Sequence, residues 1–314
     1  MDGKMVSSED RGFDMEWLSC IRKTIDILEE QILEDAELDD NFGIGKVAQE
    51  VGVSAFYLQK GFAIMTGFSI AEYVRNRRLY LAALDILSGR KVIDVALDFG
   101  YDTPDSFTKA FSRFHGVTPI QLKNEPHRLK TFLPLKINIT IQGGNKMDYI
   151  IEDAAEFTVI GFEREFVFSQ GYEKVPKFWD EMNKKYLAKV WQICKPENAI
   201  EEAILKNHVG MFGVCIDDNN SKTFRYMIAG KYEGGDIPEG LSLYKIPKTT
   251  WAKFLSKGPL PGALQSLNTK IFNEWLPGNT DWEIAMGMNI EYYMKGDSSA
   301  ADYESAIWIP VKRK

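Results

Sequence analysis

The chain has few residues that bind metals or form disulfides, with only three cysteines and three histidines among 314 residues. They are Cys20, Cys194, Cys215, His115, His127 and His208. The cysteines form no CxxC pair, so we expect reduced thiols rather than a disulfide framework or a zinc site. The scattered histidines exclude HExxH-type metal chemistry. We therefore expect no metal and no cofactor.

Long apolar runs are missing as well. No apolar stretch reaches the roughly 18 residues that span a bilayer. The N-terminal sequence MDGKMVSSEDRGFD has neither the basic start nor the apolar core of a signal peptide. We expect a cytoplasmic protein with no membrane partner. Hydrophobic residues make up 45% of the chain, which is enough to fill the cores of more than one domain.

Positive charge is scarce overall but unevenly distributed. The net charge is −7, which argues against nucleic acid as a partner of the chain as a whole. Residues 1–42 carry 4 Lys and Arg against 13 Asp and Glu, and residues 131–314 carry 22 against 24. Residues 43–130 carry 12 against 8, so they form the one net basic block. This small excess of positive charge is compatible with DNA binding but does not establish it.

One sequence pattern occurs twice in the basic block. VAQEVGVS (47–54) and VALDFGYDT (95–103) share Val, Ala, an apolar residue and Gly in the same order. Beyond this turn, residues 49 positions apart correspond, as Phe62 does with Phe111. A short helix, a glycine turn, a capping residue and a second helix make a helix-turn-helix unit. The sequence therefore predicts two such units.

Capping residues support both units. Ser54 precedes the second helix of the first unit. Thr103 precedes the second helix of the second unit, with Pro104 at the first position of that helix. Ser69 and Glu72 form a capping box that opens a long connecting helix, SIAEYVRNRRLYLAALDIL. Its predicted inward positions include Ile70, Val74, Leu81 and Leu84. A preceding amphipathic helix, IRKTIDILEEQIL, has an apolar stripe of Ile21, Ile25, Leu28, Ile32 and Leu33.

A helix-turn-helix unit places its second helix in a major groove, where exposed side chains read base edges. Two units joined by one rigid helix can enter successive grooves, about 34 Å apart, on one face of DNA. We therefore interpret the duplication as a way to read two grooves with one chain. The alternative is a helical bundle that touches no DNA.

Residues 21–124 resemble the DNA-binding domain of AraC/XylS-family transcription regulators, and GYDTPDSFTKAFSRFHGVTP (100–119) is similar to that family's signature. The resemblance implies base contacts from Phe56, Gln59, Lys60, Asp105, Ser106, Thr108 and Lys109. It also implies phosphate contacts from Arg75 and Arg78, for which internal pairing or a solvated face is the alternative. The acidic Asp105 suggests that the second unit reads few bases or accepts a hydrogen bond from cytosine.

After residue 126 the helical period is lost, and a strand pattern begins. Strand, helix, strand and strand then follow one another twice, which predicts an α+β domain with internal pseudo-symmetry. The predicted elements are strand 156–166, helix 175–190, strands 211–217 and 224–230, strand 241–256, helix 261–276, and strands 282–294 and 304–313. We thus expect a multidomain chain in which an all-α double helix-turn-helix domain precedes this α+β domain. Its parts are a mobile leader (1–14), the DNA-binding domain (15–125), a linker (126–146) and the effector-binding domain (147–314).

In the strand GMNIEYY, alternation places Glu291 and Tyr293 on the same face. The segments VIGFERE, VPKFWDEM, MNIEYY and IWIPVK resemble GyrI-like effector-binding domains, and that resemblance implies ligand binding by Glu291. A carboxylate among aromatic side chains suits a lipophilic cation. Tyr226 and Trp251 lie on strands that could line the same pocket. The alternative is a solvated glutamate on a strand.

Together these features predict a one-component transcription regulator rather than an enzyme. Its expected partners are double-stranded DNA, a small-molecule effector and RNA polymerase. Two alternatives remain for the C-terminal half. In the first, a carboxylate beside tyrosine makes it a hydrolase of a reactive small molecule. In the second, it is a protein-binding module, which an aromatic patch open to solvent would favour.

Overall fold

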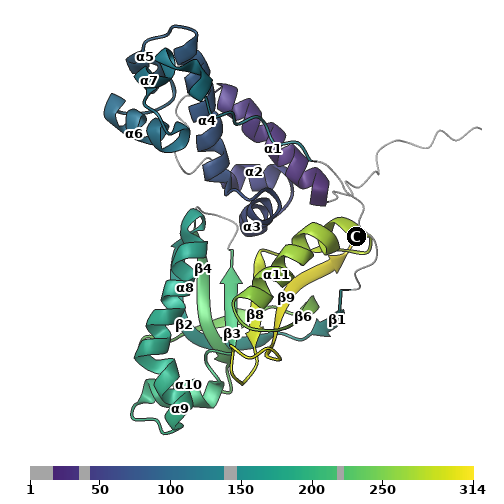
Figure 1. The fold of residues 1–314 in the computed structure, drawn as a ribbon. Helices are drawn as coiled ribbons and strands as arrows, with labels where there is room; N and C mark the ends of the chain where they lie inside the picture. Colours follow the sequence, from purple (N-terminus) through teal and green to yellow (C-terminus); the bar gives the residue numbers. More distant parts are fainter. Residues whose placement is uncertain (1–16, 35–42, 138–146, 218–222) are drawn as a thin grey trace, which may run out of the picture.

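A computed structural model describes residues 17–34, 43–137, 147–217 and 223–314. A helical body lies at one end of the molecule and a body built on a β-sheet lies at the other (Figure 1). This arrangement confirms the predicted fold class. The expected mobile leader (1–14) lies outside the described residues, as does most of the turn DDNN. Within the described part, no helix is both long and apolar enough to span a bilayer.

The helical body contains both helix-turn-helix units. Its elements are α1 (Trp17–Glu34), α2 (Ile44–Glu50), α3 (Ala55–Thr66), α4 (Ile70–Leu87), α5 (Val92–Asp98), α6 (Pro104–His115), α7 (Pro119–Asn124) and the 3₁₀ turn η1 (Pro126–Arg128). The first unit is α2 with α3, and the second is α5 with α6. Helix α4 joins them, as the sequence predicted.

The predicted caps are present. The Ser54 hydroxyl accepts a hydrogen bond from the Tyr57 amide, and the Thr103 hydroxyl accepts one from the Ser106 amide. Gly67 and Gly116 end the two second helices at φ 78° and 76°, a conformation that glycine adopts without strain. These local signals explain why the helix boundaries could be predicted well.

The inward face of α4 differs from the prediction. Leu84 is exposed, whereas Arg77 and Arg78 are buried. For the arginine cluster of this helix, the sequence analysis left internal pairing open beside phosphate contact, and charged residues are rarely buried without a partner. In α1, likewise, Leu33 is exposed, although the apolar stripe included it.

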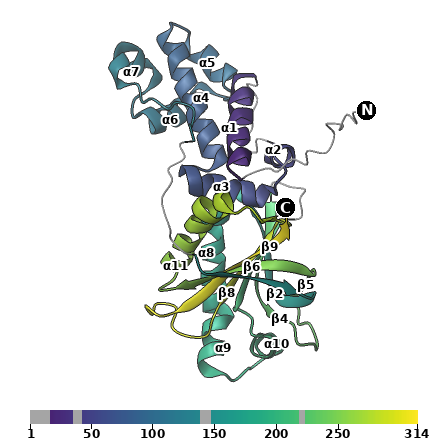
Figure 2. The same ribbon diagram turned by 90° about the vertical axis from the view of Figure 1, so that its right-hand side faces the viewer.

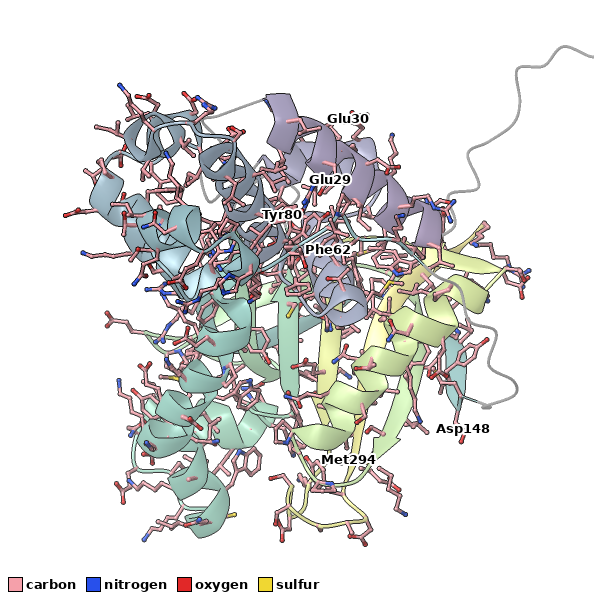
Figure 3. The ribbon with its side chains drawn as sticks, turned by 45° about the horizontal axis from the view of Figure 1, so that its top comes forward. Glu29, Glu30, Phe62, Tyr80, Asp148 and Met294 are labelled. Carbon is pink, nitrogen blue, oxygen red and sulfur yellow. The ribbon has the colours of Figure 1, made fainter. Side chains whose placement is uncertain are left out.

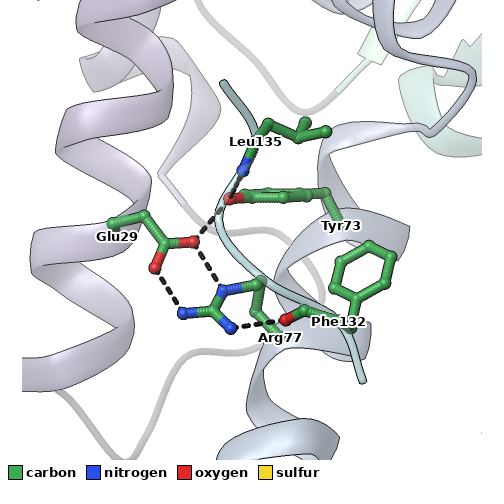
Figure 4. A network of polar contacts seen from close by, with 5 residues as sticks. All are labelled: Glu29, Tyr73, Arg77, Phe132 and Leu135. Carbon is green, nitrogen blue, oxygen red and sulfur yellow. Dashed lines mark hydrogen bonds and ion pairs between the residues drawn. The ribbon is translucent and has the colours of Figure 1, made fainter. Parts of the chain in front are cut away.

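Arg77 is buried because Glu29 of α1 neutralises it (Figure 4). Its Nε and Nη2 donate to the two carboxylate oxygens of Glu29 at 2.8 and 2.7 Å. Tyr73 donates its hydroxyl hydrogen to the same carboxylate and accepts a hydrogen bond from the Leu135 amide. Arg77 Nη1 donates to the Phe132 carbonyl at 2.5 Å. This network ties α1, α4 and the segment after α7 together.

The second body is a single antiparallel sheet with helices. Its strands are β1 (Tyr149–Ala154), β2 (Phe157–Val167), β3 (Phe212–Ile216), β4 (Thr223–Lys231), β5 (Ser242–Ile246), β6 (Thr249–Lys257), β7 (Trp282–Ile284), β8 (Met288–Tyr293) and β9 (Glu304–Arg313). Its helical segments are η2 (Phe168–Gln170), α8 (Gly171–Met182), η3 (Asn183–Leu187), α9 (Ala188–Ile193), α10 (Ala199–Asn207), α11 (Gly262–Lys270), η4 (Ile271–Trp275) and α12 (Leu276–Gly278). The strand order is β1-β6-β9-β8-β3-β4-β2-β5, with β7 paired to β9.

The predicted repeat explains this strand order. The first half contributes β3-β4-β2 and the second contributes β8-β9-β6, and β3 pairs with β8 at the centre. Helix α8 packs on β2, and α11 packs on β6 and β9. The two helices therefore lie over the two flanks of one sheet face (Figure 1).

Some strands are shorter than predicted. The segment 241–256 forms two strands, β5 and β6, with Pro247 between them. Proline cannot donate to a strand ladder, so the break falls where the backbone donor is lost. The segment 282–294 likewise divides into β7 and β8. The prediction also missed β1 and α10.

The two bodies share one hydrophobic core. A single cluster of buried side chains includes Phe56, Tyr57 and Phe62 of α3 together with Phe224 and Phe272 of the sheet body. The second helix-turn-helix unit has a separate core around Phe107 and Phe111. In both ribbon views α3 lies at the junction, between the rest of the helical body and the sheet body (Figure 2).

Replacing Glu29 by alanine is expected to destabilise the helical body by about 3 kcal/mol, because it leaves a buried guanidinium without its counter-ion. The side chains of Arg77 and Glu29 are only 5% and 18% exposed. The midpoint of urea unfolding measures the effect. Glu50→Ala is the matched control, since Glu50 pairs with Lys23 on the surface and its loss should cost less than about 1 kcal/mol. Equal shifts in both variants would contradict a structural role for the buried pair.

Acid is expected to weaken the second unit through His115, because burial lowers the pKa of this imidazole below its ordinary value. Its Nε2 lies 3.1 Å from the Leu79 carbonyl, and Phe111 and Phe114 contact its ring. With the folded-state pKa lowered, the contribution of His115 is complete above about pH 6.5 and is lost as the pH falls below it. His115→Phe should flatten thermal stability measured between pH 6.5 and 5, whereas the exposed His127→Gln should leave the wild-type slope unchanged.

Candidate functional site

A half-buried carboxylate lies near the centre of the helix-covered sheet face. Glu291 Oε2 accepts hydrogen bonds from the hydroxyl groups of Tyr293 at 2.9 Å and Tyr226 at 3.1 Å. Trp179 of α8 donates its indole hydrogen to the Tyr226 hydroxyl at 2.8 Å, and its ring meets Tyr293 edge to face. We call Trp179, Tyr226, Glu291 and Tyr293 the Glu291 cluster. Within the described part of the chain, no lysine, arginine or histidine forms an ion pair with Glu291.

A glycine makes this geometry possible. Tyr226 reaches Glu291 by crossing over Gly213, which pairs with Glu291 in the β3–β8 ladder. A Cβ atom at Gly213 would lie 2.2 Å from the Tyr226 hydroxyl and 3.1 Å from Glu291 Oε2. Any other residue there would push the tyrosine off the carboxylate.

Both tyrosines of the cluster are held in their protonated form. Burial raises the pKa of Tyr226 and of Tyr293 well above the ordinary value, and the negative charge of Glu291 adds to the effect. Protonated hydroxyls donate to the carboxylate, so they orient it without supplying positive charge. The cluster can therefore accept a cation but has none of its own among the described residues.

The structure brings together three of the four residues that the sequence suggested for the effector site. The fourth, Trp251, is fully buried in a core cluster with Met288 and Ile290, on the opposite face of the sheet from Glu291. The expectation that Trp251 lines the same pocket does not hold, because strand alternation points its side chain the other way. Trp179 takes the aromatic position instead. Trp179 belongs to the segment VPKFWDEM, to which the sequence analysis gave no role in the site.

The second reading helix, α6, presents its predicted contacts to solvent. Asp105, Ser106 and Lys109 are exposed, and Thr108 is half-buried. The Ser106 hydroxyl donates to the Thr103 carbonyl at 2.8 Å, so it also serves the helix cap. Asp105 lies in the first turn, where a carboxylate interacts favourably with the helix dipole.

The first reading helix, α3, is covered. Every residue of α3 is buried or half-buried. Phe56 is 7% exposed and packs against Phe224 of the sheet body, so it cannot contact a base in this arrangement. The Gln59 Nε2 is buried without a hydrogen-bond partner in the described structure, and Lys60 is half-buried with its ammonium 5.4 Å from the Phe56 ring.

The two arginines expected at phosphates lie in different environments. Arg75 is exposed on α4 and is free to reach solvent or DNA. Arg78 is 7% exposed and donates to the Phe99 carbonyl at 2.6 Å. The expectation of a phosphate contact from Arg78 does not hold here, because its guanidinium connects α4 to the end of α5 inside the second unit.

The described residues contain no group of three or more His, Cys, Asp or Glu side chains that could hold a metal ion. A groove beside α3, lined by residues such as Trp17, Gln49, Trp282 and Met286, has a volume of about 660 Å³. It lies at the junction of the two bodies and does not include Glu291.

A double helix-turn-helix body joined to a sheet with a central carboxylate defines a class of protein, the DNA-binding transcription regulator with a C-terminal effector-binding domain. The family described as integron-associated effector binding protein (Cass2) matches residues 150–311, and a helix-turn-helix domain family matches residues 47–125. The chain belongs to that effector-binding family through its C-terminal half and to the AraC-type regulators through its N-terminal part.

Curated relatives match the helix-turn-helix part. Regulatory protein SoxS of Salmonella typhimurium is 36% identical over 96 residues, covering 30% of this chain and 87% of that protein. Right origin-binding protein of Escherichia coli (strain K12) is 33% identical over 93 residues, covering 29% of this chain and 32% of that protein. The chain thus spans nearly all of SoxS but about a third of right origin-binding protein.

Solved structures align with about half of the chain. The structure of SAV2435 bound to tetraphenylphosphonium is 21% identical, with a TM-score of 0.44, and the alignment covers 53% of this chain and 94% of that one. An integron cassette protein of Vibrio cholerae is 15% identical, with a TM-score of 0.39, and covers 52% and 95%.

Proposed function

We propose that the effector is a lipophilic cation and that Glu291, Tyr226 and Tyr293 bind it. The observation that supports this most strongly is a half-buried carboxylate that two tyrosines orient and that no described cation neutralises. A cation moved out of water needs a counter-charge, and aromatic faces attract it further. Tetraphenylphosphonium has this chemistry, because phenyl rings surround a permanent positive charge. It is therefore the probe of choice.

We further propose how the DNA-binding body works. Lys109 and Asp105 of α6 read base edges, with Ser106 and Thr108 beside them, and Arg75 contacts phosphate. Phe56, Gln59 and Lys60 of α3 read a second groove when that helix is accessible. The effector changes transcription by shifting the protein between states that engage DNA or RNA polymerase differently. Because the target is chromosomal DNA, we propose the cytoplasm as the place of action.

Glu291→Gln should weaken tetraphenylphosphonium binding about 30-fold, which corresponds to about 2 kcal/mol, because it removes the counter-charge but keeps the shape of the side chain. Isothermal titration calorimetry of the full chain measures the change. Glu304→Gln is the matched control, since Glu304 is exposed on β9 of the same sheet. Unchanged affinity in Glu291→Gln would refute the assigned role. Appearance of a hydrolysed product during incubation with a reactive electrophile would instead favour the catalytic alternative.

Lys109→Ala should weaken binding to a site selected from a DNA library by about 1–3 kcal/mol and relax the preference at one base pair. The reason is that Lys109 is exposed on the accessible reading helix. Fluorescence anisotropy with the selected site and its single-base variants measures both effects. Lys231→Ala removes an equally exposed charge from the effector-binding domain and should change neither. If both variants lose the same affinity, the contribution of Lys109 is only its charge.

A further inference from the structure

The two reading helices differ in a way that their shared fold does not require. Helix α6 presents Asp105, Ser106 and Lys109 to solvent, whereas α3 is covered along its whole length. What covers α3 on its DNA-reading side is the effector-binding domain. The covering surface consists of Asp217, Phe224, Phe272 and Met288, and we call it the α3 seat.

The seat binds α3 at its N-terminus in the way that a DNA backbone would. The Asp217 carboxylate accepts a hydrogen bond from the Phe56 amide at 2.9 Å, within the first turn of the helix. The free amide groups and the dipole at a helix N-terminus favour an anion, and DNA phosphates commonly occupy this position on reading helices. Here a carboxylate of the same chain takes that place.

Aromatic and polar contacts hold the rest of the helix. The Tyr57 hydroxyl donates to the Met288 carbonyl at 2.6 Å, and the Tyr57 ring packs near Phe272. The ring of Phe56 lies 6.0 Å from that of Phe224. Both tyrosine and phenylalanine are buried, so the contact excludes water. A helix held in this way cannot enter a major groove, because its reading face is already occupied.

The seat adjoins the Glu291 cluster. The Met288 carbonyl accepts a hydrogen bond from Tyr57, and Met288 is the first residue of β8, the strand that carries Glu291. Met294 follows the last residue of β8, and Figure 3 shows it at the end of the domain away from Phe62 of α3. Cys215 is buried in the core cluster that also contains Phe56 and Tyr57 of α3 and Tyr226 of the Glu291 cluster. Burial raises the pKa of its thiol, the Glu291 charge raises it further, and the Lys60 ammonium lowers it. In the strand ladders Cys215 pairs with Tyr226 of the cluster and with Asn289, the residue after Met288.

We propose that the effector-binding domain keeps α3 off DNA by holding it in the α3 seat, and that a lipophilic cation at the Glu291 cluster releases it. The second clause rests on the proposed function of that cluster. The link between the two sites is β8, because the strand that carries Glu291 also carries the Met288 carbonyl that accepts from Tyr57 of α3. Without effector the protein reads DNA with α6 alone. With effector it reads two grooves.

The seat can be tested without any effector. Asp217→Ala removes the acceptor at the N-terminus of α3, and Tyr57→Phe removes the hydrogen bond to Met288 without changing charge. Loss of a helix cap or of a buried hydrogen bond shifts such an equilibrium by about tenfold. Selection from a random DNA library should give one recognition patch for the wild-type chain. Both variants should select two patches about one helical turn apart and bind that site about tenfold more tightly than wild type.

Two controls keep this result specific. Asp236→Ala removes the same charge from an exposed loop of the effector-binding domain and should behave as wild type. Thermal unfolding shows whether each variant is folded. If the wild-type chain without effector already selects two patches, and binds them as tightly as Asp217→Ala and Tyr57→Phe do, the seat does not inhibit DNA binding and the proposal is wrong.

Cys215 reports release of α3 directly. Its side chain is 7% exposed and belongs to the core cluster that α3 helps to form, so iodoacetamide should modify it slowly in the wild-type chain and faster in Asp217→Ala. Saturating tetraphenylphosphonium should speed this modification in the wild-type chain and produce the two-patch site. If calorimetry shows binding but neither readout changes, the effector role stands and its coupling to α3 is refuted. If the cation does not bind, the proposed function fails, and the Asp217 comparison still decides whether the seat inhibits DNA binding.

Discussion

The way the two domains meet depends on a position where α3 has no side chain. A Cβ atom at Gly61 would lie 2.0 Å from a ring carbon of Trp17 and 2.9 Å from one of Phe272. Glycine therefore lets α1, α3 and η4 approach closely, with the Trp17 and Phe272 rings 5.6 Å apart. This close approach makes the first helix-turn-helix unit part of the same core as the effector-binding domain, while the second unit keeps its own. Everything proposed about regulation follows from this asymmetry between the units.

Local signals in the sequence were enough to predict the helices of the DNA-binding body and the repeat in the sheet. Ser54 and Thr103 cap the helices that they were expected to cap, because a cap depends on residues three positions apart. The burial of Arg77 could not be predicted in this way. Its partner, Glu29, lies 48 residues earlier on another helix, and only the packed structure brings the two together. The inward face of α4 was misassigned for the same reason.

The distribution of apolar side chains along α3 already indicated that this helix packs against more than its own domain. Helix α6 is apolar on one side, as expected for a helix with a solvent face, whereas α3 carries Leu58, Phe62 and Met65 on one side and Phe56 on the opposite side. A helix with apolar side chains on two opposite sides needs a packing partner on each side, and for Phe56 that partner is Phe224 of the effector-binding domain. The side-chain direction of Trp251, by contrast, could not be predicted from the sequence. Its strand was predicted, but which face it occupies depends on register, and a shift of one residue reverses it.

A shared element gives the two ligands of this protein a thermodynamic connection. An effector changes an equilibrium only by binding one state better than the other. In the proposed switch this difference arises at β8, which carries both Glu291 and the Met288 carbonyl that holds Tyr57 of α3. Linkage then works in both directions, so DNA that captures α3 must favour effector binding by the same factor. The covered helix thus limits the affinity for DNA and for the effector together. The buried Gln59 Nε2 has no hydrogen-bond partner among the described residues, and because a hydrogen bond to water is lost when such a donor is buried, it opposes the seated state.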